Sequence, residues 1–138
     1  MNLLSFVHYT LGIKEIDEQH WGLIEIMNNI KSLNYSNTTE VKKFNTVLVD
    51  LQAKILHHFE YEELCMERDE YPYTIPHKRE HTILTSKLNM LSIKDYSNAG
   101  FLTNKYLVSE LQYIIVNHID YSDMQYGDWV RKNKSIVQ

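Results

Sequence analysis

Four stretches of the sequence carry apolar residues with the spacing of a helix, and this pattern most constrains the fold. Apolar side chains recur at alternating steps of three and four, which places them along one face of a helix. We therefore predict helices at residues 16–34, 39–68, 75–92 and 101–132. The connections between them are short and rich in turn-forming residues such as Asn, Ser and Gly. Because short connections place successive helices antiparallel, the predicted fold is all-α, an antiparallel up-down-up-down four-helix bundle.

The composition agrees with this fold and narrows the class of protein. The chain has 138 residues, which suits one domain over residues 1–138 with an N-terminal arm at about 1–15. Four glycines and two prolines are too few for the many tight turns of a β-sandwich or β-barrel. A formal net charge of −4, with no cluster of Lys and Arg, argues against a nucleic-acid partner.

The sequence also bears on where the protein works. No apolar run approaches the roughly 18 residues of a membrane-spanning helix, so we expect no membrane span. The N-terminus lacks the basic start and long apolar run of a secretory signal. A single cysteine, Cys65, excludes an internal disulfide framework and suits a reducing compartment. These features predict a cytoplasmic protein in which Cys65 is a small buried hydrophobe of the second helix.

Polar side chains interrupt the apolar stripes at positions where a core residue is expected. These positions are His20, His58, Glu62, His77, His81 and His118. Burying such groups without partners would cost roughly 1–3 kcal/mol each, which a marginally stable domain cannot absorb. One histidine on an apolar face is usually a hydrogen-bonded core residue, but five of them on four stripes indicate a shared partner. We infer that this partner is metal.

The spacing within the predicted helices separates these positions from their neighbours. His58 with Glu62, and His77 with His81, lie four residues apart and therefore project from one face of a helix. Two side chains one helical turn apart commonly bind a metal together. His57 lies one residue from the stripe, about 100° around the helix, and is expected at the surface.

A carboxylate on the fourth helix is expected to complete the cluster, but helical spacing leaves its identity open. Asp123 lies five residues beyond His118, which is about 140° around a regular helix. Asp123 can reach the same centre only if the cluster is wide or the helix deforms locally. Asp120 is the alternative, and spacing alone does not choose between them.

The number of candidate ligands predicts two metal ions. Five imidazoles and two carboxylates are too many for one six-coordinate ion or for tetrahedral zinc. Two octahedral ions that share both carboxylates and an oxo or hydroxo bridge use the whole set and leave a single position open. Such a centre has three histidines on one ion and two on the other. Because imidazole with some carboxylate suits iron, we predict a non-haem diiron centre in the core of the bundle.

Four segments of the chain resemble, in order, the hemerythrin family, in particular its single-domain bacterial members. The segments are GIKEIDEQH at 12–20, HFEYEELCM at 58–66, YPYTIPHKREH at 71–81 and HIDYSDMQY at 118–126. The ligands that the resemblance implies are His77, His81 and His118 for one iron, His20 and His58 for the other, and Glu62 and Asp123 as bridges. On this ground Asp123 is preferred to Asp120.

The resemblance also implies a function. Members of the family bind O2 reversibly at the iron with the open position, so we expect O2 as a ligand and no catalytic residues. The preferred interpretation is an oxygen carrier, storage or delivery protein. The alternatives are an O2 or redox sensor that acts through a partner, and a diiron oxidoreductase of the peroxidase or nitric oxide reductase type. The partners considered are O2 and an unknown redox or delivery protein.

Five further residues carry specific expectations. Leu23 and Ile115 are apolar neighbours of the ligands and are expected to line the O2 pocket. Glu60 and Glu63 fall off the second stripe and are expected to be solvated. Asp17 is expected to cap the first helix.

Overall fold

The structure of the chain is a computed structural model that describes residues 10–33, 38–89 and 101–137. These residues are almost entirely helical, and no strand occurs among them. The helices are α1 (Lys14–Lys31), α2 (Thr38–Arg68), α3 (Thr74–Asn89), α4 (Phe101–His118), the π-helix η3 (Ile119–Asp123) and α5 (Met124–Val137). None of the described helices is apolar over a length that could cross a membrane.

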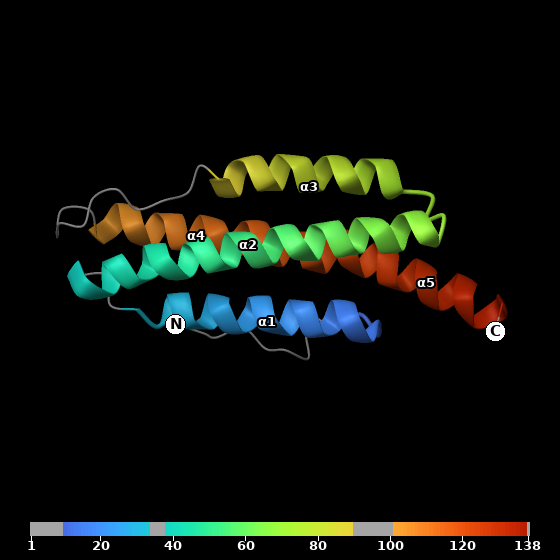
Figure 1. The fold of residues 1–138 in the computed structure, drawn as a ribbon, viewed down its shortest axis with the longest axis horizontal. Coiled ribbons are helices and arrows are strands. Elements are labelled where there is room, and N and C mark those ends of the chain that lie inside the picture. The colour runs from blue at the N-terminus through green and yellow to red at the C-terminus, as the bar shows by residue number, and fades with distance from the viewer. Residues whose placement is uncertain (1–9, 34–37, 90–100, 138) are drawn as a thin grey trace.

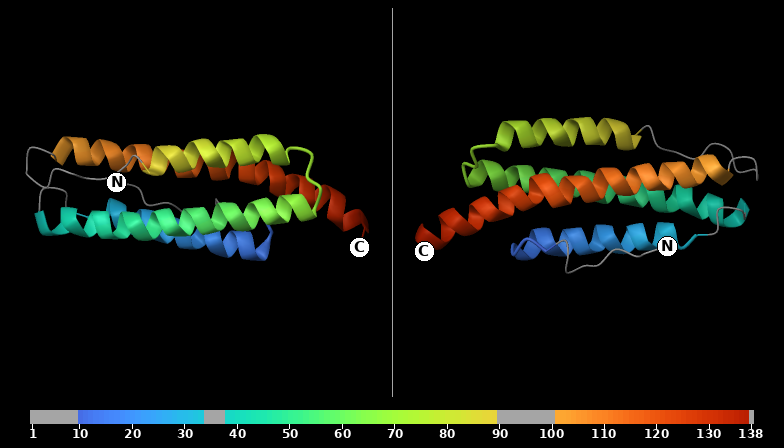
Figure 2. Two further views of the ribbon diagram at one scale, coloured as in Figure 1. Left: turned by 45° about the horizontal axis from the view of Figure 1, so that its top comes forward. Right: turned by 180° about the vertical axis from the view of Figure 1, so that it is seen from behind.

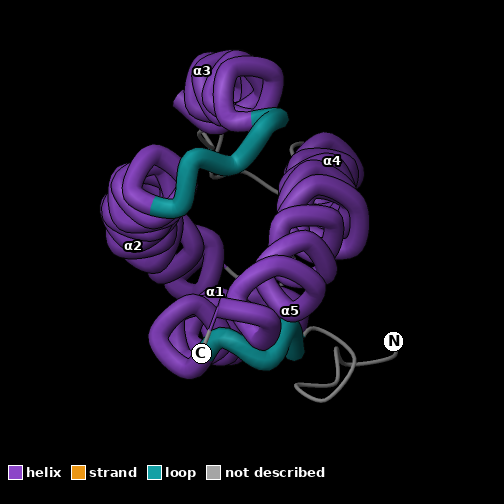
Figure 3. The backbone as a smooth tube through the Cα atoms, turned by 90° about the vertical axis from the view of Figure 1, so that its right-hand side faces the viewer, coloured by secondary structure: helices purple, strands orange, loops and turns teal. Residues whose placement is uncertain are grey.

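Successive helices run in opposite directions along one long axis (Figure 1). α1 packs beside α2, α2 packs beside α3, and α4 returns beside α1. The view along the bundle shows these helices arranged around a shared interior (Figure 3). η3 and α5 continue the line of α4, and α5 extends past the ends of the other helices (Figures 1 and 2). The predicted all-α, up-down-up-down four-helix bundle is therefore confirmed.

The last helical segment is longer and less regular than the periodicity indicated. In place of one helix over 101–132, the chain forms α4, η3 and α5, which follow one another without a break to Val137. The first helix begins at Lys14 rather than at residue 16, a difference of the size that is usual at helix ends. Pro76 lies in the first turn of α3, where its missing N–H costs no helical hydrogen bond. Most of the predicted arm at 1–15 lies outside the described residues.

The core consists of two apolar clusters with polar residues between them. Along α1, Ile16 belongs to one cluster and Leu23 to the other, and the buried ring of His20 lies between them. Along α2, Cys65 belongs to the same cluster as Ile16, and Phe59 belongs to the same cluster as Leu23. Cys65 is buried, as predicted. Apolar packing on both sides keeps water away from the polar residues and strengthens the electrostatic interactions among them.

Asp17 does not cap α1, contrary to the expectation from the sequence. The helix begins at Lys14, and the preceding residue, Ile13, makes no side-chain capping bond. The buried carboxylate of Asp17 accepts hydrogen bonds from the backbone N–H groups of Leu11 (2.6 Å) and Gly12 (2.9 Å) instead. Gly12 has a φ angle of +95°, which residues with a side chain rarely adopt. Asp17 therefore holds the segment that leads into α1 rather than the helix end itself.

Replacing Asp17 with Ala should lower the free energy of unfolding by about 2–3 kcal/mol, because the N–H groups of Leu11 and Gly12 lose a charged acceptor. Urea unfolding followed by circular dichroism measures the change. Glu18→Ala is the matched control, since Glu18 is exposed on the same helix, and its effect should stay within about 0.5 kcal/mol. Equal losses in the two variants would contradict the role of Asp17.

Candidate metal centre

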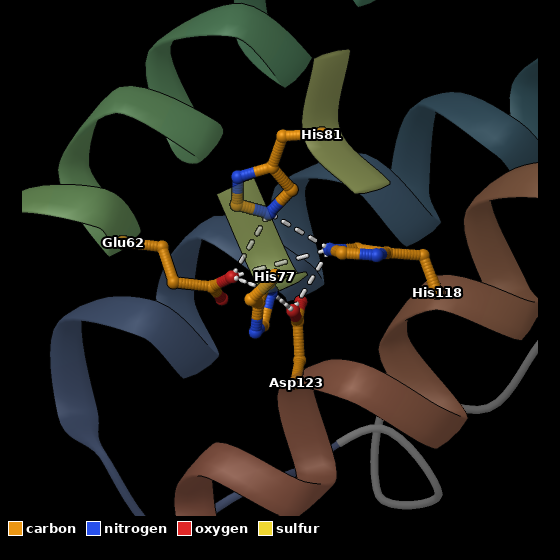
Figure 4. A group of neighbouring side chains, drawn as sticks. All are labelled: Glu62, His77, His81, His118 and Asp123. Atoms are coloured by element: carbon orange, nitrogen blue, oxygen red, sulfur yellow. Dashed lines mark hydrogen bonds and ion pairs between the residues drawn. The ribbon is translucent and has the colours of Figure 1, made fainter. Parts of the chain in front are cut away.

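Seven of the side chains that the sequence singled out meet in the interior of the bundle. They are His20 on α1, His58 and Glu62 on α2, His77 and His81 on α3, His118 at the end of α4 and Asp123 at the end of η3. Each has a relative exposure of 4% or less. Figure 4 shows Glu62, His77, His81, His118 and Asp123 converging from different helices. The fold thus brings together residues that lie as far as 103 positions apart in the sequence.

The regular helices α2 and α3 each present a pair of these side chains one turn apart. On α2, His58 Nε2 lies 3.5 Å from Glu62 Oε2. On α3, the ring centroids of His77 and His81 are 4.6 Å apart. His57, the neighbour of His58, is exposed, as predicted. Helical phase therefore separates the two adjacent histidines correctly.

The last helical segment supplies its carboxylate through a change in helical pitch. After His118 the backbone follows a π-helix, in which hydrogen bonds join residues five apart rather than four. The N–H of Met124 accordingly bonds to the carbonyl oxygen of Ile119. This wider turn brings Asp123 onto the face that His118 occupies, with Asp123 Oδ1 2.9 Å from His118 Nε2. Asp120 is exposed, so the interior carboxylate is Asp123.

The two oxygens of Asp123 face different histidines. Oδ1 lies 2.9 Å from Nε2 of His118 and 3.1 Å from Nε2 of His77. Oδ2 lies 2.8 Å from Nε2 of His20 and 3.3 Å from Nε2 of His58. A single carboxylate thus links histidines of four helical elements.

Glu62 divides its oxygens in the same way. Oε1 lies 2.6 Å from Nε2 of His77 and 3.1 Å from Nε2 of His81. Oε2 faces His58 at 3.5 Å and, although buried, accepts no hydrogen bond within the described part of the chain. A buried carboxylate oxygen without a donor is costly unless a cation interacts with it. This atom therefore fits the role of a metal ligand.

The seven side chains form two potential metal-binding groups that share both carboxylates. Within each group the candidate ligand atoms all lie within 4.8 Å of one another. The groups are Glu62, His77, His81, His118 and Asp123, and His20, His58, Glu62 and Asp123. We call them the three-histidine group and the two-histidine group. Imidazole nitrogen combined with carboxylate oxygen is a donor set that suits iron.

Comparison with known protein families agrees with this site. The family model described as the hemerythrin HHE cation binding domain matches residues 11–130. The chain belongs to the hemerythrin family. All seven side chains lie within the matched range, and the chain is a cation-binding protein of this family with a site of histidines and carboxylates.

Relatives of this hemerythrin-family chain are named bacteriohemerythrin. One from Stenotrophomonas maltophilia (strain R551-3) is 28% identical over 121 residues, which cover 88% of this chain and 76% of the relative. One from Pseudomonas aeruginosa (strain LESB58) is 28% identical over 124 residues, or 90% and 78% of the two chains. One from Clostridium acetobutylicum is 28% identical over 125 residues, or 87% and 95%. No solved structure matches the chain significantly.

In the polypeptide alone, the hemerythrin site is a network of opposite charges. Burial disfavours the charged form of His118, but the charge and hydrogen bond of Asp123, together with Glu80 and Glu62, raise the pKa of His118 to about 10. Burial acts likewise on His77, and hydrogen bonds to Asp123 and Glu62 raise its pKa to about 9. Burial also opposes the charge on Asp123, yet His118 keeps the pKa of that carboxyl well below its usual value. A cation that binds here therefore has to displace protons from imidazoles.

Three residues outside the predicted ligand set contact the outer ring nitrogens of cluster histidines. The distances from side-chain oxygen to Nδ1 are 2.7 Å for Gln19 with His58, 2.8 Å for Glu63 with His81, and 2.6 Å for Glu80 with His118. The expectation that Glu63 is simply solvated is therefore wrong, whereas Glu60 is exposed, as expected. Gln19, Glu63 and Glu80 each stand next to a cluster residue in the sequence. This adjacency is the feature of the sequence that could have identified them.

A small apolar cavity lies against the cluster. Its volume is about 10 Å³, close to the room that one water molecule needs. The rings of His58 and His118 border it, and the rest of its lining is apolar. Leu23 and Ile115, expected from the sequence to line a pocket, are both among the lining residues, as is Phe59.

Binding of Fe2+ to the metal-free chain should release protons at neutral pH. With pKa values of about 10 and about 9, His118 and His77 are largely protonated at pH 7, whereas an imidazole nitrogen that binds metal must have lost its proton. A pH indicator in weakly buffered, O2-free solution should detect about two protons per chain. Between pH 6 and 9 the apparent affinity for Fe2+ should rise about tenfold per pH unit for each proton that binding releases. Fe2+ binding without proton release would contradict the charge network.

His58→Ala should weaken Fe2+ binding by roughly tenfold or more, because losing even an outer partner of a metal ligand commonly costs 10–100-fold. Competition with a coloured chelator measures the affinity. His57→Ala is the matched control, since His57 is exposed one residue away, and its affinity should be unchanged. Equal weakening in the two variants would show that the faces of α2 are assigned wrongly.

Proposed function

We propose that the chain holds two iron ions in its core and binds O2 at them reversibly, as an oxygen carrier, store or delivery protein. The observation that carries this proposal is the division of one buried cluster into a three-histidine and a two-histidine group that share both carboxylates. Membership of the hemerythrin family and similarity to proteins named bacteriohemerythrin support it.

The oxygens of the two carboxylates suggest how two ions would be held together. Because each carboxylate faces histidines of both groups, it would act as a bridge. The proposed ligands are His77, His81 and His118 for one iron, His20 and His58 for the other, and Glu62 and Asp123 for both. With fewer protein ligands, the ion of the two-histidine group would have the open coordination position.

The chain's own contribution to O2 binding is a dry pocket of limited size. Iron would supply the electrons that O2 accepts on binding and returns on release. The cavity of about 10 Å³ borders His58 of one group and His118 of the other. Its remaining lining is apolar, so a small neutral molecule enters it more readily than an ion or a larger polar substrate.

The same lining favours carriage over catalysis. Oxygen cleavage and reduction consume protons, which an acid close to the bound molecule would deliver. Among the described residues that line the cavity, no carboxylic acid or hydroxyl group occurs, and the only polar groups are the two histidine rings. Leu23 and Ile115 instead exclude water, which limits side reactions of the bound O2.

Iron analysis combined with an O2 titration tests the proposal. The purified chain, loaded with iron and reduced without O2, should contain two irons per chain. Addition of O2 should produce a visible absorption band, and removal of O2 by argon should abolish it over repeated cycles. His57→Ala should behave like the original chain in the same cycles, because His57 is exposed.

Two outcomes would contradict the proposal in different ways. Fewer than two irons in fully reconstituted protein would exclude a diiron site. Two irons with immediate, irreversible oxidation by O2 would exclude carriage and favour the sensor or oxidoreductase alternatives.

A further inference from the structure

The outer contacts of the cluster histidines follow a regular pattern along the chain. Gln19 on α1 contacts His58 on α2, and Glu63 on α2 contacts His81 on α3. Glu80 on α3 in turn contacts His118 at the end of α4. Each seam between successive helices is therefore crossed by a hydrogen bond that ends on a cluster histidine. We call Gln19, Glu63 and Glu80 the outer acceptors.

The direction of these hydrogen bonds follows from the chemistry of the groups. The Nε2 atoms of the histidines face the interior carboxylates, so Nδ1 faces outward (Figure 4). A carboxylate can only accept, so His81 and His118 donate Nδ1–H to Glu63 and Glu80. His58 donates in the same way to the amide oxygen of Gln19.

The outer acceptors differ in charge between the two groups. Two of the rings in the three-histidine group, those of His81 and His118, donate to carboxylates. In the two-histidine group, His58 donates to a neutral amide. The hydroxyl of Ser122, the π-helical neighbour of Asp123, also donates to Glu80 and holds that carboxylate in place. Among the outer contacts that are described, more negative charge therefore lies behind the three-histidine group than behind the two-histidine group.

This difference has an electronic consequence for bound metal. An imidazole that donates to a carboxylate becomes a more basic ligand, and a more basic ligand stabilises the more highly charged metal ion. An amide acceptor orients the ring without adding negative charge. Glu63 and Glu80 are half-buried, with side-chain exposures of 27% and 37%, so water screens their charges only in part.

We propose that Glu63 and Glu80 make the three-histidine position the harder one to reduce, so that the first electron given to a diferric centre goes to the two-histidine position. The proposal rests on the diiron site of the proposed function and deepens it, because the first electron then arrives at the ion with the open position. The step is transfer of one electron from a one-electron reductant to a ferric ion, with no bond formed or broken. Glu63 and Glu80 act through His81 and His118 and are positioning residues.

Reduction potentials of the iron-loaded chain test this assignment. Spectroelectrochemical titration without O2 resolves the first and the second one-electron step. Glu63→Gln and Glu80→Gln keep an acceptor oxygen but remove its charge, so the second step should shift to a higher potential and the first should change less. Gln19→Glu adds a charge behind His58, so the first step should shift to a lower potential.

Glu60→Gln is the matched control for the change in charge. Glu60 stands on α2, three residues before Glu63, and is exposed. Its replacement alters the net charge by the same amount as Glu63→Gln, and both steps should remain where they are in the original chain. If the potentials shift only in the variants of the outer acceptors, the shift comes from the hydrogen-bonded charges and not from the change in net charge.

The possible results test this proposal independently of the proposed function. Shifts of the second step in Glu63→Gln and Glu80→Gln no larger than in Glu60→Gln, or a first step unmoved in Gln19→Glu, would overturn it. If one variant fails to load iron, the other two decide, because the three substitutions lie on different helices and each changes the charge behind a different histidine. A chain that holds two irons but reacts irreversibly with O2 contradicts oxygen carriage alone, since both potentials remain measurable. A chain that holds fewer than two irons overturns both.

Discussion

The two interior carboxylates, Glu62 and Asp123, are the constraint on which the rest of the structure depends. A negative charge in an apolar core is costly unless each oxygen has a partner, and here both carboxylates are buried. Their partners are imidazoles from every helix of the bundle, so each helix must present its histidines to the same interior point. Apolar clusters on both sides of this point, around Ile16 and Leu23, exclude water and stabilise that alignment.

The π-helix η3 shows how local geometry is adapted to this constraint. A π-helical turn is rare in proteins and is frequently found at functional sites. In this chain the turn brings Asp123 onto the face of His118 and at the same time directs Ser122 toward Glu80. One backbone irregularity therefore completes both the interior cluster and one of its outer contacts.

Much of the fold and six of the seven interior side chains followed from periodicity, whereas Asp123 was preferred to Asp120 only on the family resemblance. The surroundings of the site followed from neither. Helical phase correctly separated His58 from His57, because burial of one helix face is encoded in local spacing. Helical phase also placed Glu63 in solvent, but Glu63 is half-buried and bonds to His81. The preference of Asp for helix N-caps placed Asp17 at a cap, but Asp17 bonds to the backbone that precedes the helix. Helical phase predicts the direction in which a side chain projects from its own helix. It does not predict which atoms of a neighbouring segment lie opposite. Glu63 meets His81 only because α2 and α3 are aligned in one particular register.

The sequence by itself determined that the chain forms an all-helical bundle and which polar residues interrupt its apolar faces. Those properties depend on the spacing of residues within single helices, and residues close together in the sequence specify this spacing. Only the tertiary structure decided which oxygen of Glu62 and Asp123 faces which histidine, and which residues contact the outer ring nitrogens. It also showed the π-turn by which Asp123 reaches His118, for which helical spacing had offered only an unspecified local deformation. These features depend on the rotation and offset of one helix against another, and packing between residues far apart in the sequence sets both.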